Sequence, residues 1–194
     1  MAEEIIEQGY RELADTILEH NPGVDLGRVR AAFELADRAH SGQKRKAGTP
    51  YVTHCVAAAQ ICAEMGLDED SIVAALLHDC IEDTAITHED IARQFGAEVA
   101  DIVEGVTKLT RVQFTSREDE QMENLRKMLM AMAKDIRVIL IKIADRLHNM
   151  RTMEYMVAQK QLEKSLETME IYAPIAHRLG LQKVKWELED LSLK

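Results

Sequence analysis

Apolar residues recur at intervals of three and four positions along most of this 194-residue chain. Such spacing gathers them on one face of an α-helix, so helical periodicity dominates the pattern. The pattern predicts ten helices, near residues 3–19, 26–40, 53–65, 69–81, 88–95, 97–109, 117–133, 135–150, 159–178 and 182–192.

Capping and helix-breaking residues support several of these boundaries. Thr87 with Asp90, and Ser116 with Asp119, have the spacing of a capping box. Pro174 lies inside the ninth predicted helix and should bend or interrupt it, because proline has no backbone N–H to donate. Three glycines fall where helices should end: Gly66, Gly96 and Gly180.

The composition agrees with an all-α fold. The chain is 46% hydrophobic, yet aromatic residues make up only 4%, and it contains 10 Met and 3 Pro. This mixture favours helices packed through Leu, Ile, Ala and Met. The length suits one domain with a sizeable core, and no repeat or low-complexity linker divides it. We therefore expect a single all-α domain over residues 1–194.

The net charge of −10 argues against sequence-independent binding to nucleic acid or to an anionic membrane surface. One basic loop, Lys44–Lys46, stands out against this acidity. The three cysteines form no CxxC pair, and the acidic N-terminus lacks the basic start and apolar run of a signal peptide. No apolar stretch approaches bilayer-spanning length. We expect a soluble, cytoplasmic protein without a nucleic-acid or membrane partner.

The segment Ala74–Thr84, AALLHDCIEDT, places four ionisable side chains at the end of an apolar helix. On a continuous helix, the stripe that begins with Ile72 and Leu76 would continue into Asp79 and Asp83. A carboxylate that enters a buried face requires compensation, and a bound cation would provide it. The first hypothesis is therefore a metal site.

The predicted helix 135–150 changes character in the same way. It is apolar on two stripes, which indicates a central and largely enclosed helix. The stripe of Val138 and Ile141 continues at helical spacing into three polar residues, namely Asp145, Asn149 and Thr152. Two helices that each turn polar towards one end are expected to meet at a shared pocket.

His78 next to Asp79 is weak evidence on its own, because either residue could be a cap or a satisfied buried polar group. The metal hypothesis gains support from a second imidazole, His54, after Pro50, and from a further carboxylate, Asp145. Two imidazoles and two carboxylates suit a divalent first-row metal with positions left for water or substrate. Because this set contains no thiolate, Mn²⁺ or Fe fits better than structural zinc.

Two more carboxylates, Glu82 and Asp83, lie beside the predicted metal ligands without all being needed to bind the metal. One of them could orient a water molecule and take its proton while a second protonates a leaving oxygen. The alternative is an exposed acidic helix end, which would be preferred without His54 and Asp145.

The basic loop Lys44–Lys46 has two interpretations. Most such runs are solvated turns, but its place before His54 suggests a clamp for a phosphate or a base, because arginine stacks on rings and binds phosphate oxygens. Asn149 and Thr152 could hydrogen-bond a base or ribose, although a helix end would also accommodate them. His148 is expected to pack or to lie outside the ligand set.

Several long motifs occur in a specific order: HSGQKRKAGTPYVTH, LLHDCIEDT, GVTKL, ENLRKMLMAMAKDIRVILIKIADRLHNMRT and ETMEIYAPIAHRLG. Together they resemble the HD hydrolase domain of the bifunctional Rel and SpoT enzymes of the bacterial stringent response. The resemblance extends over nearly the whole chain and is far more specific than an HD dipeptide.

This resemblance implies an HD-domain fold of about ten helices and Mn²⁺-dependent hydrolysis of guanosine tetraphosphate and pentaphosphate, which releases pyrophosphate from the 3′ position and leaves GDP or GTP. By position it assigns metal binding to His54, His78, Asp79 and Asp145, water activation to Glu82 and Asp83, and nucleotide contacts to Arg45, Lys46, Asn149 and Thr152. Synthetase-only relatives have a degraded HD segment, whereas HDCIEDT is intact here, so hydrolysis should be retained.

Departures from the family pattern are modest. Ala47 stands where relatives often carry Ser, and Val157 with Ala158 replace a segment frequently rich in Pro, which leaves the outer nucleotide contacts open. In the long family members this segment leads into synthetase and regulatory domains; none is expected after Lys194, so we expect an excised hydrolase module or a standalone hydrolase that does not synthesise the alarmone. Two alternatives remain: a standalone hydrolase that acts on the phosphate of NADPH, and a regulatory module that binds the alarmone without cleaving it.

Overall fold

The computed structural model describes residues 1–111 and 117–194, without some side chains between 117 and 133. The all-α fold class is confirmed, since the only β-type pairing among these residues is an isolated bridge between Lys44 and Pro50. In the part of the chain that the structure describes, no helix has the length and apolar character needed to cross a membrane.

Every predicted helical range contains a helix. The elements are α1 (Ala2–His20), α2 (Leu26–Ala39), α3 (Val52–Glu64), α4 (Glu69–Leu77), α5 (Cys80–Asp83), α6 (His88–Phe95), α7 (Ala97–Thr110), α8 (Arg117–Lys134), α9 (Ile136–Arg151), a 3₁₀ turn (Met153–Tyr155), α10 (Ala158–Glu167), a π-helical turn (Thr168–Tyr172), α11 (Ala173–Arg178) and α12 (Gln182–Ser192).

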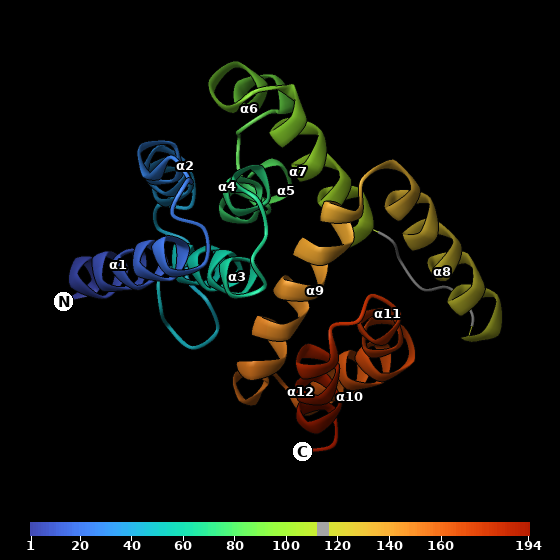
Figure 1. Cartoon of the computed structure of the whole chain (residues 1–194). Helices are drawn as coiled ribbons and strands as arrows, with labels where there is room; N and C mark the ends of the chain where they lie inside the picture. Colours follow the sequence, from blue (N-terminus) through green and yellow to red (C-terminus); the bar gives the residue numbers. More distant parts are fainter. Residues whose placement is uncertain (112–116) are drawn as a thin grey trace.

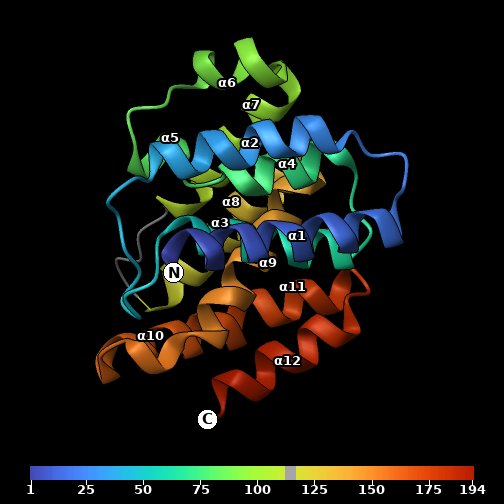
Figure 2. The same cartoon turned by 90° about the vertical axis from the view of Figure 1, so that its left-hand side faces the viewer.

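Helix α9 is the central element of the fold, as predicted. It packs against α3, α4 and α7 on one side, against α8 on another, and against α12 and the π-helical turn towards the C-terminus (Figure 1). The view turned by 90° shows α2 and α4 above α1 and α3, with α10, α11 and α12 below them (Figure 2). Residues from distant parts of the sequence therefore converge around α9.

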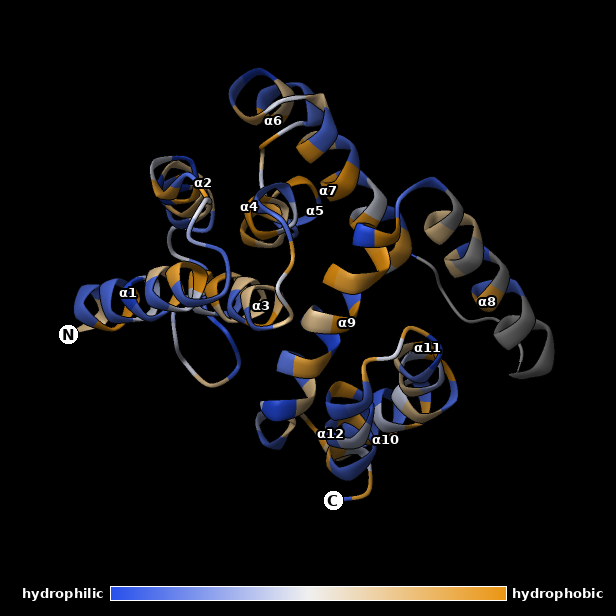
Figure 3. Cartoon of the chain, viewed as in Figure 1, coloured by the Kyte–Doolittle hydropathy of each residue, from blue (hydrophilic) through white to orange (hydrophobic). Residues whose placement is uncertain are grey.

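The core is formed by the apolar faces that meet around α3, α4, α7 and α9 (Figure 3). Small residues let these helices approach closely. At Gly105 of α7, a Cβ atom would lie only 2.8 Å from a methyl group of Val138 on α9. The GVTKL segment therefore owes its glycine to helix packing.

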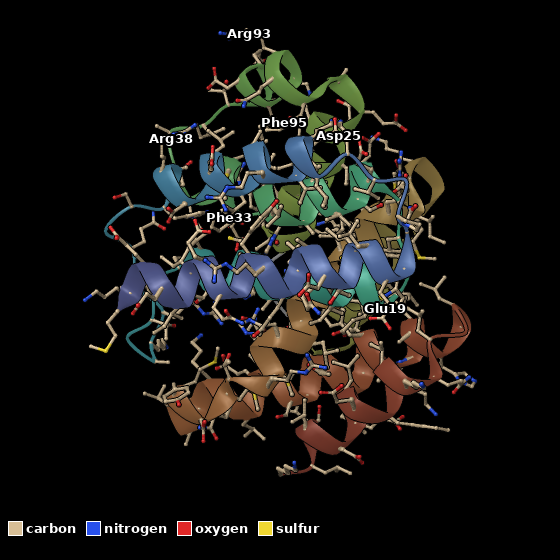
Figure 4. The ribbon with its side chains drawn as sticks, turned by 60° about the vertical axis from the view of Figure 1, so that its left-hand side comes forward. Glu19, Asp25, Phe33, Arg38, Arg93 and Phe95 are labelled. Carbon is tan, nitrogen blue, oxygen red and sulfur yellow. The ribbon has the colours of Figure 1, made fainter. Side chains whose placement is uncertain are left out.

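The N-terminal helices are joined by aromatic packing. Phe33 of α2 lies between α2 and α1 (Figure 4) and stacks on Tyr10 of α1, with 4.9 Å between ring centroids. The Arg30 guanidinium lies over both rings and also pairs with Glu7 of α1. These contacts hold the outer helix α1 against α2, while α1 also packs on α3.

Several predicted boundaries are confirmed. Thr87 and Asp90 form a reciprocal capping box at the start of α6. The predicted box of Ser116 and Asp119 lies outside the described residues. The three glycines at the helix ends all adopt positive φ angles, which favour glycine: Gly66, Gly96 and Gly180.

Two of the predicted helices are divided. The interruption expected near Pro174 is confirmed, because a π-helical turn separates α10 from α11 and the proline sits in the first turn of α11. The continuous helix predicted over 69–81 is wrong, because α4 ends at Leu77 and α5 begins at Cys80. Between them, Asp79 has φ −99° and ψ −1°. His78 and Asp79 lie at this break, close to His54 of α3 and Asp145 of α9.

Candidate metal centre and active site

Four buried side chains from three parts of the chain meet beside α9. His54 comes from the first turn of α3, His78 and Asp79 from the junction of α4 and α5, and Asp145 from α9. One candidate ligand atom from each lies within 4.8 Å of all the others. The structure thus brings together all four residues that the sequence analysis selected as metal ligands.

The imidazole Nε2 atoms face the carboxylates. His54 Nε2 lies 2.8 Å from Asp145 Oδ1 and 3.6 Å from Asp79 Oδ2. His78 Nε2 lies 3.0 Å from Asp79 Oδ2 and 3.4 Å from Asp145 Oδ1. Two nitrogen and two carboxylate donors therefore surround one point, which is the donor chemistry of a divalent transition-metal site.

The orientation of His78 fits a metal ligand. Its Nδ1 donates to the backbone carbonyl of Ala75 at 2.6 Å, an oxygen at the C-terminal end of α4. This bond leaves the lone pair on Nε2, and that buried Nε2 has no hydrogen-bond partner of acceptable geometry among the described residues. Metal-binding histidines are characteristically fixed by such a bond from the other ring nitrogen. These four residues fit a divalent cation.

The electrostatics of the cluster also call for positive charge. Burial would raise the pKa of Asp79, but the charge of the nearby His78 ring lowers it. Burial would likewise lower the pKa of His78, yet Asp79 and Asp145 raise it well above its ordinary value. In His54, burial prevails and the pKa is lowered. Two carboxylates at so buried a position are stabilised only by a nearby cation or proton.

Lys142, one turn before Asp145 on α9, is a buried member of the cluster that the sequence analysis missed. Its Nζ donates to Asp145 Oδ2 at 2.8 Å and to Thr110 Oγ1 at 3.0 Å. Asp145 Oδ2 is thereby occupied, and Oδ1 faces the imidazoles of His54 and His78. A lysine inside the apolar run VILIKIA was the sequence feature that could have revealed it.

Glu82 and Asp83 lie on α5 beside this cluster, with Glu82 half-buried and Asp83 exposed. Burial raises the pKa of Glu82, and the charges of Asp83 and Asp79 raise it further. The pKa of Asp83 is raised by burial and by Asp79. Tyr51 connects the buried cluster to the α5 carboxylates, because its hydroxyl donates to Asp79 Oδ2 at 2.7 Å and lies 3.4 Å from Asp83 Oδ2. The sequence analysis did not identify Tyr51.

The basic loop reaches across to α9 through one side chain. Arg45 Nη2 donates to Asn149 Oδ1 at 2.8 Å and lies 3.3 Å from Thr152 Oγ1. Asn149 in turn donates to Asp145 Oδ1 at 3.1 Å, which connects this polar group to the metal cluster. Lys46 is exposed on the same loop and joins none of these hydrogen bonds between described residues. The loop therefore brings Arg45 into the site and leaves Lys46 at its edge.

His148, which the sequence analysis assigned to packing or to a position outside the ligand set, contacts a predicted ligand directly. Its Nδ1 lies 2.6 Å from Nδ1 of His54. Burial, together with the charges of His54 and Arg45, lowers the pKa of His148 to about 3. It is therefore a neutral ring at physiological pH.

This helical fold, with two histidines and two aspartates around one buried point, defines an HD domain. The sequence pattern of the HD domain family matches residues 32–182, and the chain belongs to this family.

Among curated proteins, the chain is 53% identical over 174 residues to the "Probable GTP pyrophosphokinase" of Mycobacterium leprae, which covers 90% of this chain and 22% of that protein. It is 49% identical over 185 residues to the "Bifunctional (p)ppGpp synthase/hydrolase SpoT" of Escherichia coli K12, and this match covers 95% of the chain and 26% of that protein. These findings confirm the resemblance to Rel and SpoT enzymes. The chain spans about a quarter or less of the length of these relatives.

A solved structure described as "A metazoan ortholog of SpoT hydrolyzes ppGpp and plays a role in starvation responses" superimposes with a TM-score of 0.64. The likeness covers 84% of this chain and 93% of that one at 22% sequence identity. At this identity, the comparison establishes the shared fold.

Proposed function

We propose that this chain is a Mn²⁺-dependent 3′-pyrophosphohydrolase that converts guanosine tetraphosphate and pentaphosphate to GDP or GTP and pyrophosphate in the stringent response. The observation that carries this proposal is the buried cluster of two histidines and two aspartates, flanked by the carboxylates of Glu82 and Asp83 and by Arg45. Curated relatives named for (p)ppGpp synthesis and hydrolysis support the choice of substrate.

In this proposal the ligands of the cation are His54, His78, Asp79 and Asp145. A divalent cation bound there supplies Lewis acidity towards the scissile phosphoryl group and favours deprotonation of the attacking water. The donor set contains no thiolate, which favours Mn²⁺ over structural zinc. Lys142 holds the second oxygen of Asp145, so Asp145 contributes a single oxygen to the site.

Glu82 and Asp83 perform the proton transfers. The attacking water gives one proton to a carboxylate as its oxygen bonds to the phosphorus attached to the ribose 3′ oxygen. The bond from that phosphorus to the 3′ oxygen breaks, and the 3′ oxygen takes a proton from the second carboxyl group. The raised pKa values of Glu82 and Asp83 support this role, because a general acid works best with a pKa close to the working pH.

In this proposal the nucleotide is bound by the polar side chains beside the cluster, those of Arg45, Asn149 and Thr152. Arg45 lies against the guanine, since a planar guanidinium can stack on a base and pair with phosphate oxygens. Asn149 and Thr152 face Arg45 and bind the nucleoside, with Lys46 near the base and phosphates at the rim. The bonds from Arg45 to these two residues place the three side chains in one continuous polar surface.

The test is a hydrolysis assay of the tetraphosphate with Mn²⁺, Mg²⁺, Zn²⁺ or a chelator, with products separated by anion-exchange chromatography. We expect equal amounts of GDP and pyrophosphate, fastest with Mn²⁺ and none with chelator. Release of orthophosphate instead would refute the reaction.

The same assay distinguishes the two alternatives. Faster cleavage of NADPH than of the tetraphosphate under identical conditions would show that the substrate is NADPH, cleaved at its phosphate. Saturable binding of the alarmone without any product, with Mn²⁺ supplied, would make it a regulatory module. The intact Glu82 and Asp83 support hydrolysis over that second alternative.

A further inference from the structure

The site contains a pair of imidazoles whose contact has no role in the ligand set itself. Nδ1 of His54 on α3 lies 2.6 Å from Nδ1 of His148 on α9, and the ring centroids are 4.9 Å apart. Two ring nitrogens at this separation share a proton, because one must donate and the other must accept. His54 and His148 therefore fix each other's tautomers.

The direction of this hydrogen bond follows from the other side of His54. Its Nε2 faces Asp145 and Asp79, so a cation bound there requires the lone pair of His54 on Nε2. The proton of a neutral His54 then lies on Nδ1 and is donated to Nδ1 of His148. His148 carries its own proton on Nε2.

The neighbouring backbone does not offer His54 the acceptor that His78 has. His78 donates to the Ala75 carbonyl at the end of α4. For His54 the corresponding carbonyl, that of Tyr51, accepts from the His54 amide, and the ring Nδ1 lies against His148 instead. The acceptor for the His54 ring therefore comes from another helix.

Helix α9 supplies that acceptor together with a ligand. Asp145 and His148 are three positions apart, so they project from the same side of α9. The packing of α9 against α3 therefore places a carboxylate beside Nε2 of His54 and an acceptor beside Nδ1 of the same ring.

We propose that His148 is a positioning residue that holds His54 in the tautomer and orientation required to bind the metal. The proposal rests on the metal site of the proposed function and extends it to a residue outside the ligand set. Bonds of this kind to ligand histidines typically change metal affinity by about 10- to 100-fold when they are lost.

The test compares His148→Leu with His148→Asn. Leucine fills space without an acceptor, whereas the side-chain oxygen of asparagine can occupy the position of the histidine Nδ1. The Kd for Mn²⁺ alone is measured from the electron paramagnetic resonance signal of free Mn²⁺. His177→Leu, a change at an exposed histidine of α11, is the matched control. Thermal unfolding monitored by circular dichroism verifies that each variant is folded.

We expect His148→Leu to raise the Kd for Mn²⁺ by about 10- to 100-fold, and His148→Asn to remain within about threefold of the unchanged protein. An unchanged Kd in His148→Leu, or equal losses in both variants, would overturn the positioning role. Failure of the unchanged protein to bind Mn²⁺ would instead overturn the metal site of the proposed function. These results separate the two claims.

Discussion

Among the residues that the structure describes, two groups of histidine and carboxylate side chains bring their potential ligand atoms within 4.8 Å of one another, but their surroundings differ. The group of His54, His78, Asp79 and Asp145 is buried beside α9. The second group, His88, Asp101 and Glu104, lies on α6 and α7, where the Asp101 side chain is 70% exposed and that of Glu104 is 43% exposed.

The difference shows that proximity of ligand atoms does not by itself define a metal site. At the surface, water solvates the carboxylates, although Nε2 of His88 lies as close to Asp101, at 2.8 Å, as Nε2 of His54 lies to Asp145. In the buried group, water is largely excluded and Nε2 of His78 has no partner of acceptable geometry among the described residues. A carboxylate removed from water is unfavourable unless a cation compensates its charge. A fixed imidazole orientation also directs the ligand nitrogen at the metal position.

The strongest test of this comparison exchanges one carboxylate in each group. We expect Asp79→Asn to abolish measurable Mn²⁺ binding and to slow hydrolysis by at least about a thousandfold, because metal catalysis contributes several kcal/mol to the transition state. Asp101→Asn should retain the affinity and the rate of the unchanged protein. Mn²⁺ titration and steady-state hydrolysis measure both effects. Wild-type turnover in Asp79→Asn would refute the site.

A smaller effect is expected from the carboxylates that do not bind the metal. Glu82→Gln should leave Mn²⁺ binding intact and slow the chemical step by about 10²- to 10⁴-fold, since it removes a proton-transfer group. Glu104→Gln is the matched change in the exposed group and should alter neither quantity. Single-turnover kinetics beside metal analysis distinguishes the steps. Loss of bound Mn²⁺ in Glu82→Gln would place Glu82 among the ligands instead.

The fold and the four candidate ligands could be predicted from local sequence. The apolar spacing of helices α4 and α9 is a local property, and both stripes end in the polar residues that meet in the structure. Asp79 and Asp145 come from different helices, yet the sequence relates them because the apolar stripe of each helix turns polar towards one end, and His54 joins the set as a second imidazole after Pro50. Periodicity therefore reveals which faces must meet.

The contacts that orient those ligands could not be predicted in the same way. The bond between His54 and His148 depends on how closely and at what angle α3 and α9 pack, and helical spacing does not determine either quantity. The break after Leu77 was missed because an apolar run followed by ionisable residues is compatible with a continuous helix. Tyr51 and Lys142 have their roles through partners on other elements, which are close in space but distant in sequence.

The smallest expected effect concerns the exposed group and the pH dependence of stability. The hydrogen bond that His88 donates to Asp101 raises the pKa of His88 above its ordinary value, against a slight opposing effect of burial. Because the folded-state pKa exceeds the unfolded one, the pair stabilises the protein below a pH of about 6.5, and this stabilisation is lost as the pH rises through the folded-state pKa.

Asp101→Asn should therefore lower the free energy of unfolding at pH 5.5 by about 0.2–0.5 kcal/mol, and by less at pH 8.5, since solvent screens an exposed ion pair. Urea unfolding of the unchanged protein and of the variant at the two pH values measures the difference in the free energy of unfolding. The carboxylates of the buried group affect both proteins equally and cancel in this difference. The difference at pH 5.5 should shrink in 1 M NaCl because the Debye length falls to about 3 Å. A difference that persists in high salt, or that is larger at pH 8.5, would mean that Asp101 acts through something other than the charge of His88. The contrast between a solvated pair and a buried ligand cluster would then have to be drawn on other grounds.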